Sequence, residues 1–140
     1  MNDIYLKQLI FEIESWKRTI DFIENEIIFM KGRMSQILRE YPDDSLLNSI
    51  EQFQNKLLVQ DKMIQIFRID LGKQIQAVKS LLNDTNFLME TLKRQKKFRS
   101  EIETAHSQFE KMRDEFYLFF CERFYKKMLQ NAALSAVTGR

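Results

Sequence analysis

Hydrophobic side chains recur along most of this chain at intervals that alternate between three and four residues. Such a run, here called a seam, is typical of the heptad pattern with which long helices pack against one another. The first seam consists of Leu6, Leu9, Ile13, Trp16, Ile20, Ile23, Ile27, Met30, Met34, Ile37 and Tyr41. Two further seams with the same spacing, interrupted by a few polar residues, extend over 46–81 and 88–123.

Two polar segments separate the seams. At 41–45, Pro42 lacks a backbone donor and disfavours a helical conformation at the residue before it, while Asp43 and Ser45 suit the start of a new helix. At 83–86, Asn and Asp side chains favour helix ends. The sequence therefore predicts helices at about 2–40, 45–82 and 86–130. Residues 131–140 are small and weakly patterned, which predicts a flexible C-terminal tail.

Short connections make neighbouring helices antiparallel. Folding the chain at both breaks aligns the three seams in layers, and one layer contains Trp16, Leu71 and Phe98. This agreement predicts an all-α fold, a long antiparallel three-helix bundle with a coiled-coil-like heptad core over 1–130.

Glutamines occupy three of the seam positions. Gln74 and Gln95 fall in one layer, opposite Ile13, and Gln60 falls in another. The amides of Gln74 and Gln95 either bond to each other and fix the register, or they reach solvent past a thin core.

Composition excludes several kinds of site. The 140 residues include one His, one Cys and three Gly, too few for a disulfide framework, a Cys/His zinc site or a glycine-rich phosphate loop. The 22 basic and 20 acidic residues leave a net charge of +2, so no strong field directs the chain to nucleic acid. No long stretch lacks charges, no secretory signal is apparent, and the cytoplasm is the default compartment.

Few residues offer chemistry. Glu103 and His106 have the spacing of a di-iron ligand pair, but they flank the seam and there is no second histidine, so we expect a solvated surface pair. Cys121 lies off the seam among aromatic residues, where we expect a buried or half-buried inert thiol. Neither a cofactor nor an enzymatic activity is expected.

A basic cluster, defined here as Lys93, Arg94, Lys96, Lys97 and Arg99, falls in seven consecutive residues. We expect a solvated surface partly neutralised by acidic residues of the other helices. Polyanion binding through this cluster is the alternative, although nucleic-acid sites usually have a broader basic face.

The densest aromatic stretch spans 116–125. Phe116 and Phe119 are seam positions, whereas other aromatic side chains lie beyond the seam. Fold-back of the tail, a partner or second subunit, or a ligand or lipid niche are the alternatives for covering them.

A second hydrophobic line, here called the outer stripe, is formed by Ile4, Phe11, Phe22 and Phe29. On a helical wheel they lie within about 20° of one another and roughly opposite the seam. A weaker outer line on the second helix is formed by Val59, Ile66 and Ile69. The outer stripe predicts a homo-oligomer, a symmetric dimer with first helices at the interface; partial covering by the tail or by the end of the third helix is the alternative.

These features predict a non-enzymatic helical interaction or structural protein that self-associates or docks a protein partner. Two alternatives remain: a polyanion-binding module that uses the basic cluster, and an amphipathic bundle that opens to bind lipid. Neither nucleic acid nor a membrane is the expected partner.

Overall fold

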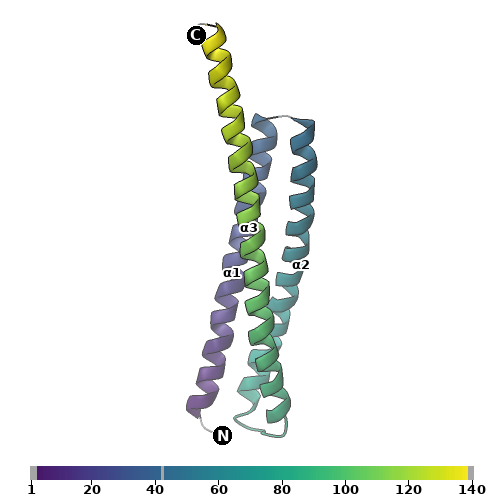
Figure 1. Cartoon of the computed structure of the whole chain (residues 1–140). Helices are drawn as coiled ribbons and strands as arrows, with labels where there is room; N and C mark the ends of the chain where they lie inside the picture. The colour runs from purple at the N-terminus through teal and green to yellow at the C-terminus, as the bar shows by residue number, and fades with distance from the viewer. Residues whose placement is uncertain (1–2, 42, 139–140) are drawn as a thin grey trace. The chain divides into compact units, whose positions relative to one another are not determined.

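The computed structural model describes residues 3–41 and 43–138, and its fold is an all-α three-helix bundle (Figure 1). Helix α1 spans Asp3–Glu40, α2 spans Asp44–Ser80 and α3 spans Leu88–Thr138. No strand occurs in these two ranges. The predicted fold class is therefore confirmed. The predicted start at residue 2, the break at Pro42 and the last two tail residues lie outside the described residues.

The third helix is longer than the sequence pattern predicts. It continues to Thr138, so the predicted helix end at residue 130 is wrong. Residues 126–138 contain Lys, Met, Leu, Gln and Ala, which are good helix formers, and neither Gly nor Pro interrupts them. Helix propensity thus continues after the hydrophobic periodicity has faded. The flexibility of the tail stays a prediction.

The backbone divides into two compact units, Met1–Ser107 and Gln108–Arg140. The first contains α1, α2 and the beginning of α3, and its core is built from the predicted seams. Nine of the eleven α1 seam residues are buried, and the other two, Ile37 and Tyr41, are half-buried. The ring centroids of Trp16 and Phe98 lie 6.4 Å apart, as the predicted layer requires.

The connection between α1 and α2 is short because a cap starts the second helix directly. Asp43 has extended backbone angles of φ −135° and ψ 125°. Its side-chain oxygen accepts hydrogen bonds of 3.0 Å from both the backbone N–H and the hydroxyl of Ser45. These bonds satisfy one of the backbone donors that a helix N-terminus leaves without a partner. The role predicted for Asp43 is confirmed.

The second unit is the remainder of α3. Phe109, Met112 and Phe116 are buried, in agreement with the predicted seam. Beyond Phe116, the buried residue is Phe120 and not Phe119, which is half-buried, so the predicted seam is wrong there. A four-residue step follows Phe116 where the heptad pattern has three, and the ring centroids of Phe116 and Phe120 lie 4.7 Å apart.

Among the described residues, no helix has a segment long and hydrophobic enough to cross a membrane.

Candidate functional site

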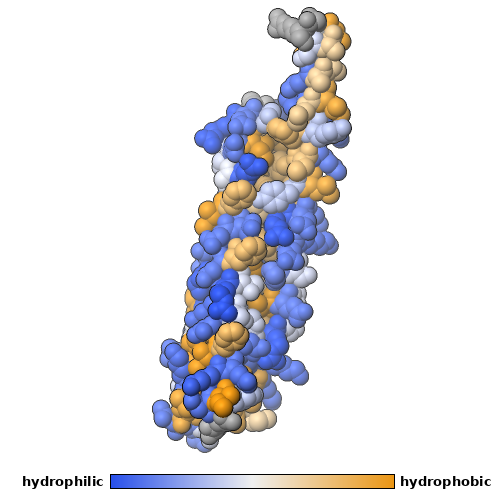
Figure 2. Space-filling model, turned by 90° about the vertical axis from the view of Figure 1, so that its left-hand side faces the viewer, coloured by the Kyte–Doolittle hydropathy of each residue, from blue (hydrophilic) through white to orange (hydrophobic). Residues whose placement is uncertain are grey.

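The outer stripe of α1 is exposed along its whole length. Ile4 and Phe11 are each 66% exposed, Phe29 is 56% exposed and Phe22 is 44% exposed. Figure 2 views the molecule from the side on which α1 lies in Figure 1, and separate hydrophobic side chains follow one another there along a mostly hydrophilic surface. Surface phenylalanines in a line exceed the scattered apolar residues of an ordinary surface. The outer stripe is therefore a candidate interaction surface.

Two arginines lie against the rings of this stripe. The Arg18 guanidinium is 5.7 Å from the ring centroid of Phe11, and that of Arg33 is 5.8 Å from the centroid of Phe29. Both distances are in the range of a cation–π interaction. The outer stripe therefore carries the positive charges of Arg18 and Arg33. A surface that packs on the stripe must accommodate these two charges.

The outer line of α2 is also exposed. Val59, Ile66 and Ile69 are on the surface, in agreement with their positions on the helical wheel, and so is Leu58. These aliphatic side chains form a second hydrophobic face within the first unit, without an aromatic residue.

A polar network joins the three helices inside the first unit. The Gln74 side-chain N–H donates to Oε1 of Gln95 and to the backbone carbonyl of Thr91, each over 3.0 Å. The Gln95 side-chain N–H donates in turn to the carbonyl of Leu9 at 3.1 Å and to Glu12 Oε1 at 2.9 Å. Both glutamines are buried. They bond to each other, which is the first of the two alternatives that the sequence left open.

The network ends at an ion pair on the surface. Arg99 donates two parallel hydrogen bonds of 2.7 Å to the carboxylate of Glu12. These bonds, together with the bond from Gln95, hold the pKa of Glu12 below its ordinary value of 4.5, although partial burial raises it. Glu12 is therefore ionised at neutral pH and fixes the position of Gln95.

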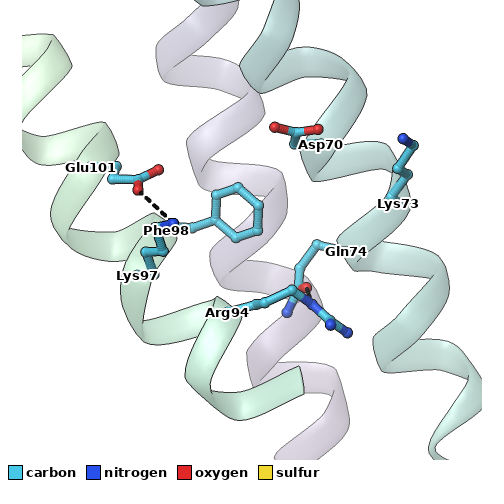
Figure 3. Close-up of a pocket in the computed structure, with 7 residues that line it drawn as sticks. All are labelled: Asp70, Lys73, Gln74, Arg94, Lys97, Phe98 and Glu101. Atoms are coloured by element: carbon cyan, nitrogen blue, oxygen red, sulfur yellow. Dashed lines mark hydrogen bonds and ion pairs between the residues drawn. The ribbon is translucent and has the colours of Figure 1, made fainter. Parts of the chain in front are cut away.

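Five groups of mixed charge line a groove of about 410 Å³ between α2 and α3 (Figure 3). Its charged residues are Asp70, Lys73, Arg94, Lys97 and Glu101, and Gln74 and Phe98 complete the lining. Arg94 and Gln74 point toward each other in Figure 3, where the Arg94 Nε–H donates to Gln74 Oε1 over 3.3 Å. Lys97 pairs with Glu101 at 3.6 Å. Three cations and two carboxylates line this groove, so it presents no single charge to a ligand.

The basic cluster is partly neutralised, as the sequence predicts. Arg99 pairs with Glu12 of another helix, Lys97 pairs with Glu101 of its own helix, and Arg94 bonds to the uncharged amide of Gln74. Lys93 and Lys96 are exposed, and neither has an ion pair within the ranges that the structure describes. Polyanion binding through this cluster stays a prediction, and it is supported by the exposed charges of Lys93 and Lys96.

The remaining candidates for chemistry lie apart. Glu103 is exposed and His106 half-buried on the surface of α3. Over 3–41 and 43–138, no three His, Cys, Asp or Glu side chains come close enough to hold a metal ion. Cys121 is exposed, so the prediction of a buried or half-buried thiol is wrong. It follows Phe120 directly, and none of residues 121–137 is buried.

An ion-pair network between α1 and α2 was not foreseen. Arg68 donates hydrogen bonds of 2.6 Å to both Asp21 and Glu24, and the Gln65 amide donates to Glu24 at 3.1 Å. These bonds raise the pKa of Arg68 above its ordinary value. The antiparallel register would have indicated the network, since it places Arg68 nearly opposite Asp21.

Comparison of this chain with protein-family models, with curated proteins and with solved structures finds no match.

Proposed function

We propose that this chain is a non-enzymatic interaction protein that self-associates through the outer face of α1. The observation that carries the proposal is the exposure of Ile4, Phe11, Phe22 and Phe29 along one line of a single helix. Burying a Phe side chain contributes roughly 1.5–3 kcal/mol, so a set of three offsets part of the entropic cost of association. A cytoplasmic location fits a chain that contains one cysteine.

The outer line of α2 gives a second hydrophobic face. Ile66 and Ile69 would enlarge an assembly or dock a different protein, because they belong to another helix. Doubly substituting them, Ile66→Glu with Ile69→Glu, tests whether this face contributes to the association of the wild-type protein.

Light scattering after size-exclusion chromatography tests the proposal. We expect wild-type protein at roughly 50 µM to have about twice the monomer mass of 16.9 kDa. Phe22→Glu with Phe29→Glu should give a monomer of unchanged helix content, because a carboxylate opposes burial but is tolerated on a solvated helix face.

A neighbouring residue supplies the matched control. Ile28 is 61% exposed on the same helix, but it lies about 100° from Phe29 around the helix axis. Ile28→Glu introduces the same charge at nearly the same height as Phe29→Glu, and it should leave the mass unchanged. A wild-type protein that scatters as a monomer would overturn self-association.

A further inference from the structure

The spacing of the outer stripe has a symmetry of its own. Successive members are separated by seven, eleven and seven residues, so Phe11 pairs with Phe22, and Ile4 with Phe29, about a midpoint between residues 16 and 17. A two-fold axis through that midpoint, perpendicular to α1, would bring each residue of a pair opposite its counterpart in a second copy. Isologous packing of this kind requires a self-complementary surface.

We propose that two copies of this chain pack their α1 helices antiparallel about this axis. The proposal deepens, and rests on, the proposed self-association. Phe11 then packs against the partner subunit's Phe22, and Ile4 packs against the partner subunit's Phe29. Because seven plus eleven residues complete five turns of an α-helix, the stripe runs parallel to the helix axis over about 37 Å and meets its counterpart along the full length.

The same two-fold axis also pairs charged residues that flank the outer stripe. Antiparallel packing places like flanks of the two helices together. On one flank, Arg18 then lies beside the partner subunit's Glu14, and the second such pair forms on the other side of the axis. On the opposite flank, Gln8 lies beside the partner subunit's Glu26. The two Arg18 residues lie on the same flank about 4.5 Å apart along the axis, but each is nearer in level to the partner subunit's Glu14.

Parallel packing of two α1 helices would place like charges opposite each other at the centre of the outer stripe. Arg18 lies over the ring of Phe11, and therefore near the middle of the contact face. In a parallel dimer, Arg18 would face the partner subunit's Arg18 across the interface, and like charges held together oppose association. In the antiparallel dimer the two Arg18 residues are also close, but each has the partner subunit's Glu14 beside it, and this compensation favours the antiparallel arrangement.

The available area fits a dimer of modest affinity. Four side chains, each about half exposed or more, provide roughly 400 Å² of hydrophobic area per copy, if a Phe side chain offers about 200 Å² in all. Stable interfaces bury about 800 Å² per partner, so the flanking polar side chains must supply the other half. A dissociation constant on the order of micromolar is therefore expected.

Spin-label distances test the arrangement in the full chain. Labels are attached at Lys7→Cys or Asn25→Cys in a Cys121→Ser background, since Lys7, Asn25 and Cys121 are all exposed. With 1.5 Å of rise per residue, the antiparallel dimer separates two Lys7 labels by about 30 Å. In the same dimer, a Lys7 label and the partner's Asn25 label lie within about 15 Å.

A parallel dimer reverses the two distances and would overturn the inference. A protein that scatters as a dimer but gives neither distance would overturn the α1 pairing and leave self-association in place. A protein that scatters as a monomer would overturn both proposals.

Charge exchange gives an independent test of the flanking pairs. Arg18→Glu brings a carboxylate against the partner subunit's Glu14, and it should raise the dissociation constant roughly tenfold. Combining Arg18→Glu with Glu14→Arg should restore it to within about threefold, because the pair is re-formed with its signs exchanged. Lys17→Glu makes the same charge change about 130° from the stripe and should have little effect. A double variant as weak as Arg18→Glu alone would overturn the pairing.

Discussion

The side-chain amide of Gln74 on α2 donates a hydrogen bond to that of Gln95 on α3, 3.0 Å away and buried in the core. Gln95 also bonds to α1 through the carbonyl of Leu9 and the carboxylate of Glu12. One buried side chain thus connects all three helices. Because a shift in register would leave these amides without partners, the pair gives the hydrophobic seams a single alignment.

Replacing one of the two glutamines should cost more than replacing both. Gln74→Leu or Gln95→Leu leaves the remaining amide partly unsatisfied, at about 1–3 kcal/mol, whereas the double variant removes both amides. The predicted order of urea midpoints places the double variant above either single variant, and Gln95→Leu lowest because Gln95 contacts two helices. The carbonyls of Leu9 and Thr91 still accept bonds within their helices. Two single variants with the wild-type midpoint would contradict this prediction.

A third seam glutamine is not satisfied in the same way. Gln60 has a buried Oε1 with no hydrogen-bond partner among the described residues. An unsatisfied buried acceptor costs about 1–3 kcal/mol. We predict that Gln60→Met, which is similar in length and lacks the amide, increases the free energy of unfolding by about 1 kcal/mol. Gln54→Met on the exposed face of α2 is the control; an equal gain there would trace the effect to helix propensity.

The loss of folding stability at acid pH, here called the acid limb, should depend on Glu12. Its pKa is lower in the folded protein than the ordinary value of 4.5, so protonation favours the unfolded chain. The stabilisation is complete above the unfolded pKa and is lost as the pH falls through the folded pKa. Glu12→Gln should therefore flatten the loss of stability below pH 4.5, measured as the urea midpoint against pH.

Arg99→Lys refines this experiment. A lysine keeps the charge but cannot form the two parallel bonds that Arg99 makes to Glu12, so it should flatten the acid limb only in part. An acid limb that is identical in wild type, Glu12→Gln and Arg99→Lys would show that other carboxylates control it.

The sequence predicted the layers of the core because hydrophobic period and chain reversal together determine which seam positions meet. Trp16 against Phe98, and Gln74 against Gln95, follow from that arithmetic. The hydrogen-bond partners of long, flexible side chains do not follow from the hydrophobic period and the chain reversal. Arg68 bridges Asp21 and Glu24, and Arg94 turns toward Gln74, because rotamers and competing partners decide where a flexible side chain bonds.

The predictions for α3 were less successful past Phe116. One step of four residues moved the buried position from Phe119 to Phe120, and helix propensity carried the backbone beyond the hydrophobic pattern. Cys121, the residue after Phe120, is exposed. A seam constrains the sequence only where helices pack on it, so periodicity loses its information near the end of the packed segment.

The cap at the start of α2 should be worth about 0.5–2 kcal/mol. Asp43 accepts two hydrogen bonds from Ser45, and Asp43→Ala removes both. We predict a lower thermal midpoint for Asp43→Ala and a nearly unchanged one for Asp43→Asn, whose side chain still accepts the backbone bond. Equal destabilisation by both substitutions would assign the effect to the negative charge of Asp43 at the helix N-terminus rather than to the bonds.

Glycine in the middle of a helix gives the last prediction. Gly32 lies inside α1 without breaking it, and a Cβ added there meets nothing within 4 Å. Alanine lowers the conformational entropy of the unfolded chain and has the higher helix propensity, so Gly32→Ala should raise the free energy of unfolding by about 0.5–1 kcal/mol. Gly72 in α2 has the same open surroundings, and Gly72→Ala should give a similar, additive gain. Chemical denaturation of the two single variants and the double variant measures each gain in the free energy of unfolding and shows whether the gains add. A loss of stability in Gly32→Ala alone would indicate that a second subunit approaches α1 closely at that position.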